Sequence, residues 1–346
     1  MKKLLKCVLA LSLATALLAG CTTKSKNEET PFTVSMIADV GGINDQSFNQ
    51  SAWEGLQKLK GGHAIEVSFL EANQEAEYGP HASRMVDDKT DLIWGVGFRM
   101  GDAIESTARM NPDRLFAIVD FAYDNSPENI IGVVFKAEEP SFLVGYMAAL
   151  TTQSDKVGFI GGIRGNIIDQ FEYGYRAGVE YAAKELGKDI EVVVQYADSF
   201  GDVAAGRAIA TVMYAEGADI IFHAAGGVGL GVIEAAVEMD KLVIGVDRDQ
   251  SDLAPNHVMT SALKLVGQAM YDVSLRVFNG EELGGQTLVF GITEKGVGIP
   301  DYAGSTANLV SREAYDRTMG VQDSILNGDI VVPYNEVTFI NFLNSL

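Results

Sequence analysis

The sequence has few cysteines and few basic residues, and each shortage excludes a class of function. Its two cysteines, Cys7 and Cys21, lie within the first 21 of 346 residues, so the rest of the chain has no disulfide, no cysteine nucleophile and no thiolate metal site. The four histidines show no HxH or HExxH spacing, which argues against a structural zinc site. We therefore expect no bound metal.

Positive charge is also scarce, with 26 Lys and Arg against 47 Asp and Glu and a formal net charge of −21. A nucleic-acid binder must neutralise phosphates with clustered basic residues, so this balance excludes nucleic acid as a partner. The same deficit argues against a basic patch that docks on anionic lipid. With 47% hydrophobic residues and only 8 prolines, the chain has enough apolar material for about two domains.

The N-terminus has the pattern of an exported lipoprotein. Three lysines in the first six residues precede an apolar run, over residues 4–19, that is shorter than a membrane-spanning helix needs. The run ends Leu18-Ala19-Gly20-Cys21, which resembles the bacterial lipobox, where the peptide is cut before the cysteine and the thiol is acylated. An ordinary signal peptide or a short membrane anchor is the alternative.

We expect a signal peptide over residues 1–20, and a lipidated Cys21 that begins a flexible tether over residues 21–31. Loss of residues 1–20, with their three lysines, takes the net charge to −24. The mature protein would then lie outside the cytoplasmic membrane, held by its lipid alone. ATP and NAD(P)H are scarce there, so we expect no cofactor.

From residue 32 the chain alternates short β-rich runs with longer helical patterns, which predicts βαβ units and parallel sheets. The expected strands cover residues 33–38, 65–70, 92–95, 115–119, 130–135, 157–161, 190–196, 220–223 and 242–246. The expected helices include residues 46–59, 101–109, 138–151, 169–186, 202–216 and 229–239. The pattern restarts near residue 157 and holds too many strands for one sheet, so we expect an α/β protein of two lobes, each a parallel sheet flanked by helices.

The chain is expected to cross between the lobes near residues 135–139, 260–263 and 286–290, and a helix over 266–278 would return to the first lobe. The predicted lobe boundaries are therefore residues 32–137 plus 264–285 for lobe 1, and 138–263 plus 286–346 for lobe 2.

Carboxylates follow three of the predicted strands, at Asp39, Asp120 and Asp247. Ligands of parallel sheets bind outside the carboxyl ends of the strands, so these side chains are expected around one crevice. An ionised carboxylate accepts two or more hydrogen bonds and suits the vicinal hydroxyls of a sugar. Paired carboxylates also serve glycosidases, and strand-end aspartates also cap helices and form turns.

An aromatic residue from each lobe would allow the crevice to hold a flat base. Phe48, near the start of the predicted helix 46–59, lies among polar residues, which favours a ring that projects into the crevice. In the second lobe, Phe222 ends a strand and Phe200 lies in a loop, and sequence alone does not separate them. Stacking on each face contributes about 1–3 kcal/mol in nucleic-acid complexes.

A glycine-rich turn over residues 226–231 follows strand 220–223 and opens a helix. Its spacing is GxGxG rather than GxGxxG, so it is a weak dinucleotide signal, and Gly227 is expected to bring backbone N–H groups close to a ligand. Lys264, after a crossing strand, is expected to donate to a ligand or to pair with a carboxylate of the crevice. The chain has no GxxxxGK[ST] motif and no GxSxG motif, which excludes a P-loop nucleotide-binding protein and an α/β-hydrolase.

Five segments form a specific combination: residues 39–49 (DVGGINDQSFN), 53–55 (WEG), 141–145 (SFLVG), 225–229 (AGGVG) and 245–250 (GVDRDQ). Together they resemble the basic-membrane-protein family of bacterial lipoproteins, and most of all its purine nucleoside receptor branch. The likeness covers residues 32–333. The resemblance implies a type I periplasmic-binding-protein fold with three crossings, which serves an ABC importer.

In the purine-binding members of that family an aromatic pair sandwiches the base, Asp and Asn read its edge, and an Asp and a Lys hold the ribose. The resemblance makes Phe48 the first aromatic and favours Phe222 over Phe200 as the second. The other residues it implies for the site are Asp39, Asn49, Asp120, Gly227, Asp247 and Lys264. Asp45, in the first of the five segments, is also expected to bind the ligand. His223 and Tyr123 depart from the pattern, and we expect them near the site, where they would alter base preference.

These observations predict a lipid-anchored monomer that captures a purine nucleoside (guanosine, adenosine or inosine) between two lobes and passes it to the permease of an ABC transporter. It would break no bond. Three alternatives remain open on the sequence: an extracellular nucleoside or glycoside hydrolase that uses Asp39, Asp45 or Asp120; a sensor or adhesin; and a receptor of the same fold for a sugar or a signalling ligand.

Overall fold

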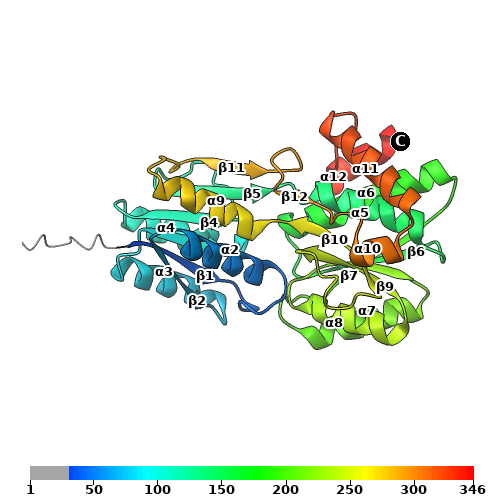
Figure 1. Ribbon diagram of the computed structural model, residues 1–346, viewed down its shortest axis with the longest axis horizontal. Helices are drawn as coiled ribbons and strands as arrows, with labels where there is room; N and C mark the ends of the chain where they lie inside the picture. Colours follow the sequence, from blue (N-terminus) through cyan, green and yellow to red (C-terminus); the bar gives the residue numbers. More distant parts are fainter. Residues whose placement is uncertain (1–30) are drawn as a thin grey trace, which may run out of the picture. The chain divides into compact units, whose positions relative to one another are not determined.

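The computed structural model describes residues 31–346, of which residues 32–346 form one compact unit. The predicted signal peptide, the lipobox, Cys21 and nearly all of the tether lie outside the described residues. Within the compact unit, two six-stranded sheets form two lobes (Figure 1). The prediction of two α/β lobes is confirmed.

The first lobe contains a fully parallel sheet in the order β11-β5-β4-β3-β1-β2. Its strands are β1 (Phe32–Ala38), β2 (Ile65–Glu71), β3 (Leu92–Val96), β4 (Leu115–Val119), β5 (Ile130–Phe135) and β11 (Thr287–Phe290). Its helices are α2 (Phe48–Gly62), α3 (Tyr78–Asp87), α4 (Gly101–Met110) and α9 (Val266–Phe278), with short 3-10 turns η1 (Glu75–Glu77) and η2 (Phe98–Met100).

The second lobe repeats this order as β12-β10-β9-β8-β6-β7, with a short antiparallel edge strand, β12. Its strands are β6 (Lys156–Gly161), β7 (Glu191–Tyr196), β8 (Ile220–Ala224), β9 (Leu242–Asp247), β10 (Val258–Lys264) and β12 (Val297–Gly298). Its helices are α5 (Glu138–Thr151), α6 (Asn166–Leu186), α7 (Val203–Ala215), α8 (Val228–Met239), α10 (Gly304–Leu309), α11 (Arg312–Leu326) and α12 (Glu336–Ser345). No helix of residues 31–346 has the length and apolar character needed to cross a membrane.

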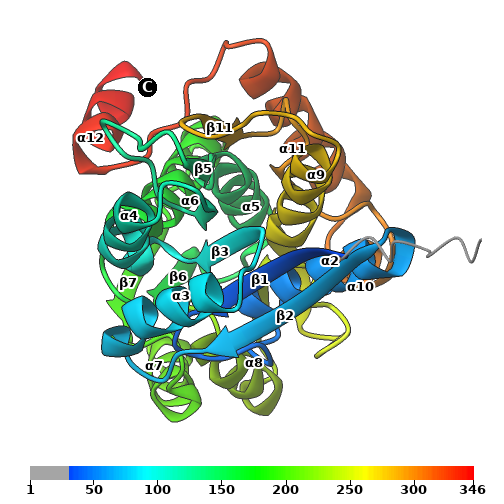
Figure 2. The ribbon, with the colours of Figure 1, turned by 90° about the vertical axis from the view of Figure 1, so that its left-hand side faces the viewer.

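Helices cover both faces of each sheet, as Figure 2 shows for the first lobe. Alternate residues of β1 therefore enter different cores: Met36 packs with α2, whereas Ile37 packs with α3 and α4. On the first of these faces, the buried indole N–H of Trp94 donates to Ser274 Oγ of α9 at 3.0 Å. Burial on both faces explains why the strands are apolar runs without alternation.

Helix α9 lies so close to α2 that no side chain fits between them. A Cβ atom at Gly267 would clash with the Ser51 carbonyl oxygen, and one at Gly55 would clash with the Gly267 backbone. The segment after the second lobe is thus an integral part of the first lobe, as predicted for residues 266–278.

The last predicted lobe boundary, between residues 285 and 286, is wrong. Strand β11 pairs in parallel with β5, with Thr287 opposite Gly132, and so belongs to the first sheet. The chain crosses to the second lobe only between Phe290 and Val297. The error arises because a four-residue edge strand has no sequence signal for the sheet that it joins.

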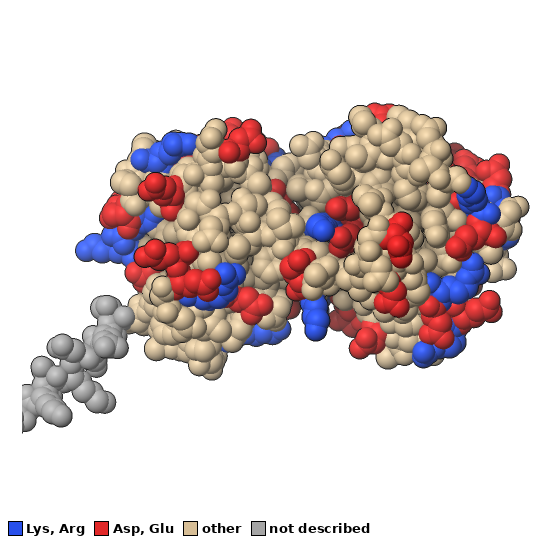
Figure 3. Space-filling model, turned by 90° about the horizontal axis from the view of Figure 1, so that it is seen from above, with Lys and Arg blue, Asp and Glu red and all other residues tan. Residues whose placement is uncertain are grey.

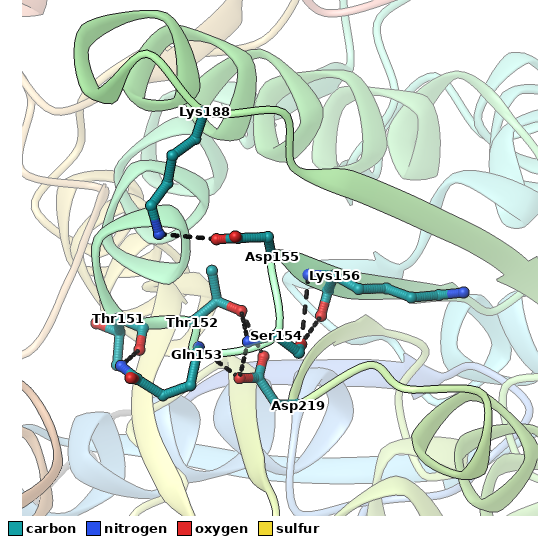
Figure 4. A network of polar contacts seen from close by, with 8 residues as sticks. All are labelled: Thr151, Thr152, Gln153, Ser154, Asp155, Lys156, Lys188 and Asp219. Atoms are coloured by element: carbon teal, nitrogen blue, oxygen red, sulfur yellow. Dashed lines mark hydrogen bonds and ion pairs between the residues drawn. The ribbon is translucent and has the colours of Figure 1, made fainter.

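At the end of the second lobe opposite the strand carboxyl ends, a polar network holds the loop between α5 and β6 (Figure 4). The Asp219 carboxylate accepts from Thr152 Oγ1 at 2.6 Å and from the backbone N–H groups of Gln153 and Ser154 at 2.6 and 3.1 Å. Lys188 pairs with Asp155 beside it at 2.8 Å. The Asp219 carboxylate thus accepts from three donors that have no hydrogen-bond partner within a helix or strand.

We expect Asp219→Ala to lower the free energy of unfolding by about 2–4 kcal/mol, because it leaves these donors without their charged acceptor. Urea denaturation measures the loss. Asp189→Ala, an exposed position in the loop before β7, is the matched control and should change stability by less than about 0.5 kcal/mol. Equal stability of the two variants would contradict the assignment.

Candidate functional site

A narrow cleft lies between the lobes, at the carboxyl ends of both sheets, and its empty space of about 580 Å³ is partly open to solvent. The residues that line it are Asp39, Val40, Asp45, Phe48, Asn49, Gly97, Phe98, Asp120, Ile167, Ile168, Phe171, Phe200, Ala224, Ala225, Gly226, Val246, Asp247 and Lys264. Eight of the ten predicted ligand-binding residues are therefore brought together here, and Phe222 and Gly227 are not.

Two of the cleft carboxylates occupy equivalent places in the two lobes. Asp120 follows β4 and Asp247 ends β9, and these strands hold the same position in the order of their sheets. Both residues have left-handed backbone, with φ of 66° and 67°. This conformation is unfavourable for a side chain other than glycine and is concentrated at functional sites.

Lys264, at the end of β10, carries the positive charge of the cleft. Its ammonium group pairs with Asp120 Oδ2 of the other lobe and lies 4.9 Å from the centre of the Phe48 ring. Only 2% of Lys264 is exposed. Asp120 Oδ1 is buried and accepts no hydrogen bond from the described residues, which leaves it available to a ligand hydroxyl.

Asp45 positions other groups and has no free oxygen toward the cleft. Its oxygens accept four hydrogen bonds: from the backbone of Ser47, Asn49 and Gln50 and from Asn49 Nδ2, at 2.9–3.0 Å. Burial raises the pKa of Asp45, and these donors oppose that rise. The carboxylate thus caps the start of α2 and fixes the Asn49 amide, whose oxygen accepts from the Asp39 N–H.

One carboxylate oxygen of Asp39 is occupied by hydrogen bonds, and the other faces the cleft. Its Oδ1 accepts from the buried Tyr78 hydroxyl and from the Val40 N–H. Its Oδ2 lies beside Gly97, which also lines the cleft. Burial raises the pKa of Asp39, against the lowering effects of the Tyr78 hydrogen bond and of the nearby Arg99.

The expectation that favoured Phe222 over Phe200 is wrong. Phe222 is fully buried in β8 and packs edge-on against Phe159 in the core of the second lobe. Phe200, in the loop before α7, lines the cleft. Gly227 lies just before α8, close to the Phe200 carbonyl. The preceding residue, Gly226, lines the cleft instead.

Two cleft aromatics, Phe98 and Phe171, escaped the sequence analysis. Phe98 follows β3, and reading the residues after every predicted strand would have found it. Phe171 lies inside α6, where nothing in the sequence marks it off from a core residue. His223 and Tyr123 do not line the cleft: His223 is buried beneath Gly229 of α8, and Tyr123 donates to the Gly101 carbonyl.

Burial raises the pKa of Asp247 to about 6, with Asp45 and Asp120 adding to the rise and Lys264 and Ser47 opposing it. A carboxyl whose pKa is raised by folding stabilises the folded protein below its ordinary pKa of 3.8, and this contribution is lost as pH rises through about 6.

We therefore expect the wild-type protein to gain about 1 kcal/mol more stability than Asp247→Asn when the pH falls from 7.5 to 5. The free energy of unfolding, measured by urea denaturation at both pH values, gives the difference. Asp252→Asn, at an exposed position, controls for the general loss of negative charge and should keep the wild-type slope.

The family model described as "Bmp: ABC transporter substrate-binding protein PnrA-like" matches residues 32–336. The chain belongs to this family. Family membership makes it a solute-binding protein of an ABC transporter, without enzymatic activity. The hydrolase alternative is thereby removed.

Two similar relatives extend over nearly the whole chain. Basic membrane protein D of Borreliella burgdorferi is 39% identical over 334 residues, which cover 94% of this chain and 95% of the relative. The CD4+ T-cell-stimulating antigen of Listeria monocytogenes is 38% identical over 323 residues, which cover 87% and 88%.

Solved structures confirm the type I periplasmic-binding-protein fold. An ABC transporter solute-binding protein from Aeropyrum pernix superposes with a TM-score of 0.82 at 24% identity, over 91% of this chain and 97% of that chain. The lac repressor also superposes, with a TM-score of 0.53 at 15% identity, over 79% and 93%. A fold shared by a transport protein and a repressor leaves the ligand to be argued from the cleft.

Proposed function

We propose that this family member captures purine nucleosides and delivers them to the importer. The observation that carries the proposal is the composition of the cleft: Phe48 of one lobe and Phe200 of the other line the same narrow space. Flat apolar side chains from opposite walls suit the two faces of a base.

The polar groups of the cleft support a sugar beside the base. Asp120 and Asp247 end strands in opposite lobes, and Lys264 lies between carboxylates. Carboxylates accept hydrogen bonds from paired hydroxyls, and an ammonium donates to their oxygens. Asp39 Oδ2 and the fixed Asn49 amide remain for the edge of the base.

The ligand is expected to be uncharged. Among the described residues that line the cleft, Lys264 is the only base, and it is already paired with Asp120. A phosphate would meet four carboxylates there. On the face seen in Figure 3, Lys and Arg lie in small separate groups among Asp and Glu, which offers no wide basic surface to attract an anion.

A thermal-shift screen tests the proposal on protein without residues 1–21, which keeps the compact unit of residues 32–346. The protein is unfolded, dialysed and refolded to remove bound ligand. Guanosine, adenosine or inosine at 100 times its dissociation constant should stabilise it by about 2.7 kcal/mol, whereas AMP and ribose should not. A response to sugars alone, or tighter binding of AMP than of adenosine, would refute the nucleoside proposal.

We also propose that Cys21 carries a lipid that holds the protein on the outer face of the cytoplasmic membrane. The lipobox sequence at residues 18–21 and the start of the compact unit eleven residues after Cys21 support this. Mass spectrometry of protein extracted from membranes should find an acylated N-terminal Cys21. Release of Cys21→Ser into the soluble fraction is expected, and its retention on the membrane would contradict the anchor.

A further inference from the structure

At the border of the cleft, two loops from opposite lobes are joined by side-chain hydrogen bonds. Ser47 Oγ of the first lobe donates to Asp247 Oδ2 of the second. Gln250 Nε2 of the second lobe donates to the Gln46 carbonyl of the first at 2.9 Å. Ser47 and Gln250 are 0% and 1% exposed. Neither of them lines the cleft.

Gln250 is rigidly held within its own lobe. Its Oε1 accepts from the Val246 N–H at 3.0 Å, and its own N–H donates to Ser261 Oγ at 3.1 Å. These bonds leave the Nε2 group as the part of the side chain that reaches the other lobe. A donor fixed in this way loses little conformational freedom when the lobes meet.

The acceptor is also held in place. Gln46 has left-handed backbone, with φ of 54°, which is unfavourable for a residue other than glycine. The Asp45 carboxylate fixes this turn through the N–H groups of Ser47 and Gln50. The Gln46 carbonyl is thus presented to the other lobe by a prearranged loop.

We propose that Gln250 and Ser47 form an interlobe latch, in which Gln250 is a positioning residue that holds the closed lobes together without contact with the ligand. The latch slows ligand release and thereby sets affinity. An ion pair between Arg248 and Glu54, at 3.7 Å, lies at its edge and adds little because both side chains are partly exposed.

Gln250→Glu tests the latch with a small change. It keeps an acceptor for the Val246 N–H and replaces the donor that faces the Gln46 carbonyl, so an oxygen meets an oxygen there. The same side chain lies close to the buried His223. Gln268→Glu, at an exposed position on α9, is the matched control for the added charge. Ser47→Ala removes the second bond with no change in charge.

Guanosine is the probe, and its use rests on the proposed nucleoside ligand. We expect Gln250→Glu to weaken guanosine binding 10- to 100-fold at pH 7.5 through faster dissociation, with an association rate within threefold of wild type. Ser47→Ala should weaken binding less. Ser47→Ala should keep the wild-type melting temperature of the unliganded protein to within a few degrees, whereas Gln250→Glu should lower it because it places a carboxylate at a buried position.

The lobe separation is followed in the same variants with fluorophores at Met110→Cys on α4 and Val212→Cys on α7, both exposed positions. The chain has no cysteine after Cys21, so both labels are specific. We expect Gln250→Glu to lengthen the mean distance with and without ligand, relative to Gln268→Glu.

Two results would overturn the latch: equal guanosine affinity of Gln250→Glu and Gln268→Glu, or weaker binding of Gln250→Glu with unchanged lobe distances and dissociation rate. Failure of the wild-type protein to bind guanosine would refute the nucleoside ligand instead. In that case the distances in the unliganded variants decide the latch, and identical distances refute it.

Discussion

Replacement of Lys264 by methionine should reduce nucleoside affinity at least 100-fold. The ammonium group is almost fully buried and pairs with Asp120 across the lobes, while Asp247 lies close enough for Lys264 to lower its pKa. Removal of one partner from a buried ion pair costs about 3–5 kcal/mol because the other charge is left uncompensated. At about 1.4 kcal/mol for each factor of ten, the lower figure already exceeds 100-fold.

Titration calorimetry with guanosine measures this loss. Lys188→Met is the matched control, because Lys188 pairs with Asp155 at the far end of the second lobe and is partly exposed (Figure 4). Addition of Asp120→Asn to Lys264→Met should recover at least tenfold of the lost affinity, since it removes the unpaired charge. Unchanged binding by Lys264→Met would show that the ammonium is no part of the site.

The second large effect separates a phenylalanine that lines the cleft from one that is buried in the core. Phe48→Ala should weaken guanosine binding by about 1–3 kcal/mol, or roughly 5- to 150-fold, because one face of the base loses its stacking partner. Phe48 is partly exposed at the start of α2, so its removal should change stability little. Phe48→Trp should keep most of the affinity.

Phe222→Ala should behave in the opposite way. Phe222 is 0% exposed and contacts Phe159, Phe171 and Tyr175 in the core, so its truncation should lower the free energy of unfolding by about 3–5 kcal/mol. Urea denaturation and calorimetry on both variants give the comparison. Loss of affinity in Phe222→Ala without loss of stability would return Phe222 to the site.

The sequence predicts the architecture well, because alternating strands and helices leave few topologies open. It also predicts which loops meet, since carboxyl ends of parallel strands share one edge, and Asp120 and Asp247 are found on that basis. The direction in which each side chain points is harder to predict from the sequence. In a strand buried on both faces every residue is apolar, so nothing in the sequence shows that Phe222 faces α6 and not the cleft.

The prediction of loop residues at the site fails for a related reason. No periodicity governs the segment after β7, so the residues alone do not favour Phe200, and the resemblance ranks it below Phe222. Asp45 was placed at the site by its motif, but only the hydrogen-bond pattern shows that its oxygens are occupied by the start of α2. The pairing of Gln250 with Gln46 joins residues 204 positions apart, and no local pattern predicts such a contact.

The course of the chain through the first lobe also governs the order in which the protein assembles. Trp94 bonds to Ser274, Gly55 packs on Gly267, and the outer edge of β5 pairs with β11, and all three partners come after strands β6–β10 of the second lobe in the chain. An N-terminal fragment that ends at residue 137 therefore lacks one helix and one strand of its own domain. During synthesis the first lobe emerges first but stays incomplete, with its apolar surfaces open to chaperones, until about residue 290 has emerged.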